Sequence, residues 1–255
     1  MSLVSPVALA GTYARAQLLE AVRTPISIIM GIGTPTVAFL FFVLPQRRIA
    51  EDPDAAAAAV AALCVFGVML NCLFEFSVEI SQMRDRPWGK YLRTLPSPAV
   101  ARVLGYLGST GVLAILSVIP LLVIAWVTTD AQVTLGGLLL GFAALAVTAV
   151  PSMLLGVCVG YLTRPKAAVA VAQVLMLLLA FGGGLFLPPQ LFPDALDAFS
   201  MALPTRAALE ITSWAALGGD AVPWIPLAVL LAWVAALASL ALVLIRRDAS
   251  AVIRS

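Results

Sequence analysis

AAAAAVAALCVFGVMLNCLFEF, residues 55–76, is an almost entirely apolar run that contains one amide, Asn71, and one carboxylate, Glu75. The hydrocarbon core of a bilayer is about 30 Å thick, and a helix needs about 20 mostly apolar residues to cross it. This stretch therefore predicts a helix that spans a membrane.

The rest of the chain has the same character. Hydrophobic residues make up 62% of the 255 positions and charged residues only 11%, whereas soluble domains contain about 25% charged residues. We therefore expect an all-α, multi-pass membrane protein of a single domain, residues 1–255. It would have an N-terminal interfacial segment at 1–25, a six-span bundle at 26–245 and a tail at 246–255. The six expected spans are residues 26–44, 55–76, 103–127, 133–161, 167–187 and 223–245.

The distribution of positive charge predicts how the chain is oriented. Short cytoplasmic loops of membrane proteins are enriched in Lys and Arg. With the N-terminus inside, twelve of the 15 Lys and Arg residues would be cytoplasmic, and only Arg47, Arg48 and Arg206 would lie outside. Both termini are therefore predicted to be cytoplasmic.

Several functional classes are disfavoured by composition. The net charge of +2 gives no indication of nucleic-acid binding. Histidine is absent and Cys64, Cys72 and Cys158 lie in separate apolar runs, so the common zinc sites and the Ser-His and Cys-His nucleophile pairs are missing. We expect no cofactor or metal on this chain.

The most highly charged window is SQMRDRPWGKYLRTLPSPAV, residues 81–100, in the predicted first cytoplasmic loop. After Pro87, a suitable first-turn residue, apolar and basic residues occupy opposite faces of a short helix. The apolar face holds Trp88, Tyr91, Leu92 and Leu95, and the basic face holds Arg86, Lys90 and Arg93. The periodicity fits equally a membrane-surface helix and a helix that docks on a protein.

A second unusual stretch, residues 182–214, lies outside between the fifth and sixth spans. Glycines and prolines end the fifth helix, and Pro193 opens another segment in which Leu191, Ala195, Ala198 and Ala202 recur at helical spacing. Non-spanning backbone at membrane depth is tolerated where protein buries it. The segment is therefore either a re-entrant outer cap or an ordinary loop with interfacial helices.

Two carboxylates lie near the cytoplasmic end of the second span. Glu75 and Glu79 are one turn apart and share a helix face, and an ionisable residue at membrane depth indicates a functional role. They could gate a pathway, or Glu75 could pair with a cation of the following loop and fix its geometry.

These features match a known family. The loop after the second span contains Glu79, Gly89 and the turn TLPSP at 94–98, and the outer segment reads GLFLPPQLFPDALDAFSMALPT at 184–205. In both respects, and in its topology, the chain resembles the permease subunit of type-2 ABC exporters, in particular the daunorubicin-resistance-like group, over nearly its whole length.

The resemblance implies an ATP-driven exporter subunit in the bacterial inner membrane. A coupling helix would dock on a separate cytoplasmic ATPase that binds ATP and Mg²⁺, since this sequence has no phosphate-binding G-x-x-x-x-G-K-[ST] motif. A second permease copy, identical or paralogous, would complete the path for a drug or lipid-like compound. The implied coupling residues are Arg84, Arg86, Trp88, Gly89, Lys90, Tyr91, Leu92 and Arg93. The implied outer-cap residues are Phe186, Pro188, Pro193 and Pro204.

Other classes remain as alternatives. A membrane-embedded enzyme would need a polar catalytic cluster, but Asn71, Glu75, Ser77 and Gln173 offer no nucleophile with a suitable base. A secondary transporter or channel would show inverted repeats or rings of charge, which the sequence lacks. Within the exporter reading, the cargo could be a polysaccharide instead of a drug or lipid.

Overall fold

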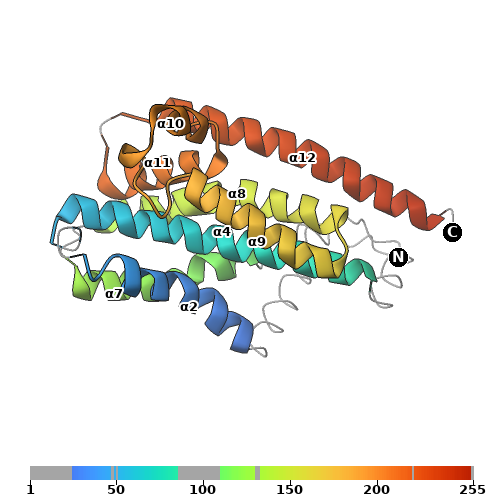
Figure 1. Ribbon diagram of the computed structural model, residues 1–255, viewed down its shortest axis with the longest axis horizontal. Helices are drawn as coiled ribbons and strands as arrows, with labels where there is room; N and C mark the ends of the chain where they lie inside the picture. Colours follow the sequence, from blue (N-terminus) through green and yellow to red (C-terminus); the bar gives the residue numbers. More distant parts are fainter. Residues whose placement is uncertain are drawn as a thin grey trace, which may run out of the picture.

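The computed structural model describes residues 25–46, 49, 51–85, 110–129, 133–219 and 221–253, without the side chains of 25–32 and 249–253. Within these ranges all regular structure is helical, and the helices form an elongated bundle (Figure 1). The all-α prediction is confirmed for the part of the chain that is described.

Among the residues that the structure describes, five helical segments are long and apolar enough to cross a membrane. They are α4 (Pro53–Asp85), the segment Thr110–Thr128 that ends in α7 (Ile119–Thr128), α8 (Leu135–Leu162), α9 (Pro165–Gly182) and α12 (Trp224–Ile253). The first expected span coincides with α2 (Pro25–Phe42), but only Gly33–Phe42 of it has described side chains. A sixth crossing therefore stays a prediction.

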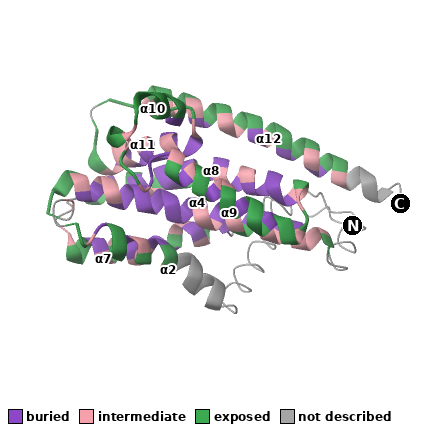
Figure 2. Ribbon diagram, in the orientation of Figure 1, coloured by how far each residue is buried: buried purple, intermediate pink, exposed green. Residues whose placement is uncertain are grey.

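The run at 55–76 becomes the centre of the bundle as part of α4. This helix contacts α2, α7, α8, α9 and α11, and most of its apolar residues are buried, whereas α9 and α12 expose most of theirs (Figure 2). Gly156 and Gly160 of α8 let the two backbones approach closely, because a Cβ at Gly156 would lie 2.7 Å from that of Phe76. The α4–α8 contact is thus the most tightly packed helix pair around the centre.

One expected helix end is wrong, and one helix continues beyond the expected end of its span. The fifth span was expected to continue to Leu187 but α9 ends at Gly182, because Gly184 adopts a positive φ of 79° and Pro188 and Pro189 follow. The last span was expected to end at Ile245, yet α12 continues to Ile253, so most of the predicted tail is helical.

Three short helices lie between α9 and α12, at the outer end of the predicted topology: η1 (Pro189–Leu191), α10 (Asp194–Ser200) and α11 (Pro204–Leu217). The expected helix around Pro193 is present as α10, but Leu191, Ala195, Ala198 and Ala202 are exposed. Instead α11 is the packed element, since it contacts α4, α8, α9 and α12. Its buried face comprises Pro204, Thr205, Ala207, Ala208, Leu209, Ile211, Thr212 and Ala215.

Candidate functional site

Charged residues gather at the two ends of the bundle. Five of the described cations lie where α4 and α12 end and α8 turns into α9: Arg84, Arg164, Lys166, Arg246 and Arg247. The opposite end carries Glu51, Asp52, Asp54, Asp194, Asp197, Arg206 and Glu210. This segregation agrees with the charge asymmetry of the sequence, and the cytoplasmic location of the basic end remains a prediction.

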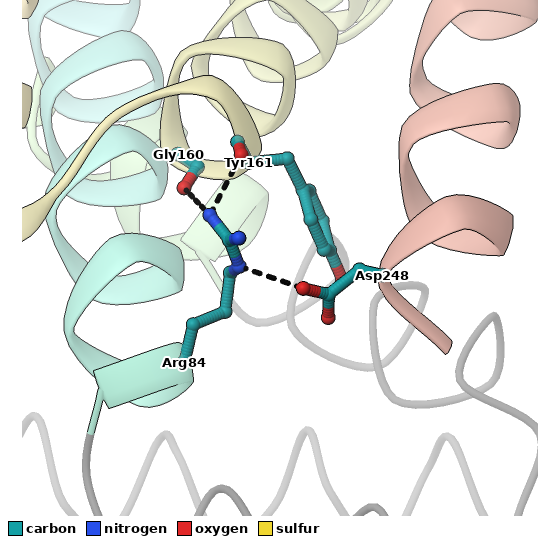
Figure 3. Close-up of polar contacts among 4 residues, drawn as sticks. All are labelled: Arg84, Gly160, Tyr161 and Asp248. Atoms are coloured by element: carbon teal, nitrogen blue, oxygen red, sulfur yellow. Dashed lines mark hydrogen bonds and ion pairs between the residues drawn. The ribbon is translucent and has the colours of Figure 1, made fainter. Parts of the chain in front are cut away.

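Arg84 joins three helices at the basic end. From the last turn of α4, its Nε donates to Oδ1 of Asp248 on α12 at 3.0 Å, and its Nη1 donates to the carbonyl oxygens of Gly160 and Tyr161 on α8 at 3.2 and 2.6 Å (Figure 3). The guanidinium carbon also lies 5.4 Å from the centre of the Tyr161 ring. We call Arg84, Gly160, Tyr161 and Asp248 the arginine tie.

The chemistry of the tie explains why arginine is suited to this position. The last carbonyls of a helix have no partner within the helix, and α8 ends at Leu162. A cation there also interacts favourably with the helix dipole. Arg84 can satisfy two of these carbonyls and a carboxylate together because its planar guanidinium offers five donors, which the ammonium of a lysine cannot do.

The arginine tie bears on the expected coupling residues. Arg84 lies one residue before the end of α4. The other seven expected coupling residues lie within 86–93, outside the described part of the chain. Their docking role stays a prediction. Asp248 and Tyr161 could not be predicted from the sequence, because the ion pair connects positions 164 residues apart and neither residue belongs to a local pattern.

Glu75 and Glu79, the two glutamates of α4, differ in environment. Glu75 is exposed, whereas Glu79 is half-buried. One turn before Glu75, Asn71 donates from Nδ2 to Ser117 Oγ at 3.0 Å and to the carbonyl oxygen of Gly67 at 2.8 Å. Ser117 occupies the turn that breaks the third span just before α7. We call Asn71, Glu75 and Glu79, which recur at one-turn spacing on α4, the polar strip. Its first residue, Asn71, meets the break in the third span.

The expected outer-cap residues occupy distinct positions. Phe186 packs its ring against those of Phe42, Phe66 and Phe181, with centroids 4.7 to 6.2 Å away. Pro188 and Pro193 are exposed and precede η1 and α10, and Pro204 is buried at the first position of α11. Only Phe186 and Pro204 thus contribute to packing.

Hydrogen bonds attach the outer cap to two spans, and ion pairs connect residues within the cap. Thr205 Oγ1 donates to the carbonyl oxygen of Leu179 on α9 at 2.8 Å, and Trp233 Nε1 on α12 donates to that of Ala202 at 2.8 Å. Arg206 pairs with Glu210 at 2.5 Å and with Asp197 of α10 at 3.6 Å. The cap is therefore held by α9 and α12 as well as by its own charges.

The comparison with known families decides the class of this protein. A family model described as ABC-2 type transporter matches residues 9–217, which include α2 to α11 and the basic loop. The chain belongs to the ABC-2 type transporter family. It is also similar to the Bacillus subtilis (strain 168) protein named "Putative transport permease YvfS", with 23% identity over 229 residues, 86% of this chain and 89% of the relative.

The family and the apolar helices together establish a multi-pass membrane protein of the transport-permease type. The relative spans a similar length, so the resemblance of the sequence to permease subunits is confirmed at the level of the family. Three features of this ABC-2 permease follow one another along the central helix α4. They are the arginine tie at its last turn, the polar strip, and the outer cap.

Proposed function

We propose that this protein is the permease subunit of an ATP-driven exporter that moves a hydrophobic or amphipathic compound, such as a drug or lipid-like molecule, out of a bacterial cell. A second permease copy completes the translocation path, and a separate cytoplasmic ATPase binds ATP and Mg²⁺. Family membership supports the permease role, and the mostly apolar character of the spans supports an apolar cargo.

The observation that carries the proposal is the arginine tie. Movement imposed on residues 86–93 by an ATPase reaches α4 directly, because α4 ends at Asp85. Arg84 then passes that movement to α8 and α12 through its contacts with Gly160, Tyr161 and Asp248. Because α4 also contacts α11, one rigid helix connects the ATPase side to the outer cap.

The polar strip of α4 fits a position beside the path. A carboxylate that faces lipid acyl chains is costly, so intramembrane carboxylates usually face protein or water. The exposed side chain of Glu75 therefore lies, in this proposal, toward the second permease copy or the shared path. Its neighbour Asn71 bonds across to Ser117 at the break in the third span, where the helix can bend during transport.

The energy source distinguishes this function from a secondary transporter or channel. Inverted membrane vesicles that contain the permease and its ATPase should accumulate a fluorescent amphipathic dye when ATP is supplied, and should continue to do so after a protonophore abolishes the ion gradient. Dye accumulation that requires the ion gradient and is independent of ATP contradicts the proposal.

The docking helix can be tested separately. Trp88→Ala together with Tyr91→Ala should release the ATPase during co-purification, because truncation of a buried aromatic anchor commonly costs about 2 kcal/mol, or about 30-fold in affinity. The matched control replaces Arg86, Lys90 and Arg93 with Ala, which removes rim charges and should weaken binding less. If the control loses the ATPase and the aromatic variant keeps it, the segment is a membrane-surface helix.

A further inference from the structure

An apolar groove runs along the outer half of the bundle, between the N-terminal halves of α4 and α8 and the C-terminal half of α11. It is partly open to the surface and is lined by 13 residues, among them Ala57, Ala61, Gly137, Gly141, Thr212 and Ala216. The helices that form it lie side by side at the left of Figure 1. We call this space the outer groove.

Small residues create the outer groove. Ala57 and Ala61 are one turn apart on α4, and Gly137 and Gly141 are one turn apart on α8. A Cβ on Gly137 would collide with the carbonyl oxygen of Ala216, so α8 and α11 are in direct backbone contact at this edge. Larger residues at Ala57, Ala61 and Gly141 would fill the groove.

One hydroxyl in the lining has no hydrogen-bond partner. Thr212 is only 2% exposed, and its Oγ1 is buried without a partner among the described residues. A helical threonine can donate to the carbonyl of the preceding turn, as Thr128 and Thr148 do in this protein. Buried hydroxyls are normally paired, so Thr212 indicates a partner that is supplied by a bound molecule.

We propose that the outer groove holds one acyl chain of a bilayer phospholipid and that Thr212 donates a hydrogen bond to the ester carbonyl of that chain. Water is an unfavourable occupant of the groove, because a buried water needs two to four polar partners and Thr212 offers one in a lining that is otherwise almost wholly apolar. An acyl ester suits this site, since its apolar chain matches the apolar lining and its carbonyl oxygen can accept a hydrogen bond from Thr212.

The position of the groove agrees with this occupant. Gly137 lies in the first turn of α8 and Ala57 in the second turn of α4, so the groove opens near the ends of two membrane spans. Phospholipid esters lie at that boundary of the hydrocarbon core, and the acyl chain extends from it toward the middle of the bilayer. The lipid would therefore fill the seam between the spans and α11.

A photoreactive lipid locates the occupant. The full-length permease is reconstituted in vesicles of phosphatidylethanolamine and phosphatidylglycerol that contain a phosphatidylethanolamine with a diazirine on one acyl chain. Irradiation and peptide mass spectrometry should map the adduct to the groove-lining peptides of α4, α8 and α11. The Ala61→Leu variant, which fills the groove, should lose most of this adduct, whereas Ala58→Leu, on the same helix but outside the lining, should keep it.

The isosteric variant Thr212→Val tests the hydrogen bond. In lipid-depleted detergent it should have an equal or higher melting temperature than the wild type, because it removes a buried, unpaired hydroxyl. When phosphatidylethanolamine is added back, the wild type should gain more thermal stability than the variant. An equal gain in both proteins, or groove peptides without adduct in the wild type, overturns the proposal.

Discussion

Arg84 on α4 and Asp248 on α12 form an ion pair of 3.0 Å between residues 164 positions apart, while the same guanidinium binds two terminal carbonyls of α8. The side chains are 31% and 17% exposed. Exposed ion pairs contribute about 0 to 1 kcal/mol, whereas hydrogen bonds that involve a charged group contribute about 1.5 to 3 kcal/mol. The carbonyl contacts should therefore account for most of the stability that the tie contributes.

Arg84→Ala should lower the free energy of unfolding by about 2 kcal/mol, and Asp248→Asn by about 1 kcal/mol or less. Arg84→Lys should restore only part of the loss, because an ammonium cannot reproduce the fork of contacts. Thermal unfolding in detergent measures these differences. Lys166→Ala, an exposed change at the same end, is the control and should leave the melting temperature unchanged. Equal effects of Arg84→Ala and Lys166→Ala contradict the prediction.

The tie also predicts a functional defect. If it passes movement from the ATPase side to α8 and α12, Arg84→Ala should keep ATP hydrolysis in the complex while transport per ATP falls. The measurement is the ratio of transported dye to released phosphate in reconstituted vesicles. An unchanged ratio shows that the tie only stabilises the helix ends.

The orientation can be checked by labelling from outside. In a background without Cys64, Cys72 and Cys158, a cysteine at Asp54 or Asp220 should react with an impermeant thiol reagent on intact cells. A cysteine at Lys90 or Lys166 should react only after the membrane is opened. Labelling of the lysine positions in intact cells reverses the orientation.

The close contact of α4 with α8 predicts opposite effects at two glycines of one helix. Gly156→Ala should destabilise the protein, since its Cβ would lie 2.7 Å from Phe76 Cβ and 2.9 Å from the carbonyl oxygen of Leu73. Gly136→Ala meets nothing closer than 4.0 Å and should stabilise the helix by up to about 1 kcal/mol. Melting temperatures of the two variants should therefore move in opposite directions.

The outer cap predicts a transport defect that is separable from assembly. Pro188→Ala with Pro193→Ala frees the backbone before η1 and α10 and should reduce transport while the ATPase still co-purifies. Pro53→Ala, at the exposed start of α4, is the matched control and should transport normally. Full transport by the double variant leaves only the ordinary-loop interpretation.

Hydropathy predicted the five long apolar helices found among the described residues, because length and apolar composition determine which helices can cross a bilayer. It failed at Leu187, where apolar residues continue beyond the glycines that end α9. It also could not identify α11 as a core element. That helix carries Arg206 and Glu210, and two of the helices that bury its other face, α4 and α8, are distant from it in sequence.

Only the parts of the candidate site whose residues are close together in the sequence could be predicted. The glycines and prolines of the cap and the amphipathic pattern of 86–95 can be recognised within one turn or two. The arginine tie and the pairing of Asn71 with Ser117 depend on which helices become neighbours, and no periodicity encodes that. The unpaired hydroxyl of Thr212 likewise becomes apparent only after α11 is buried.

The packing of α11 among α4, α8, α9 and α12 constrains the order of biogenesis. Three of these neighbours precede α11 in the chain, but α12 is synthesised after it. Trp233 of α12 supplies the hydrogen bond to Ala202 just before α11, so the cap cannot reach its final position until the last span has entered the membrane. A nascent chain that stops before residue 224 would therefore lack both α12 and the contact by which α12 holds the cap, and synthesis of α12 becomes the step that completes this end of the bundle.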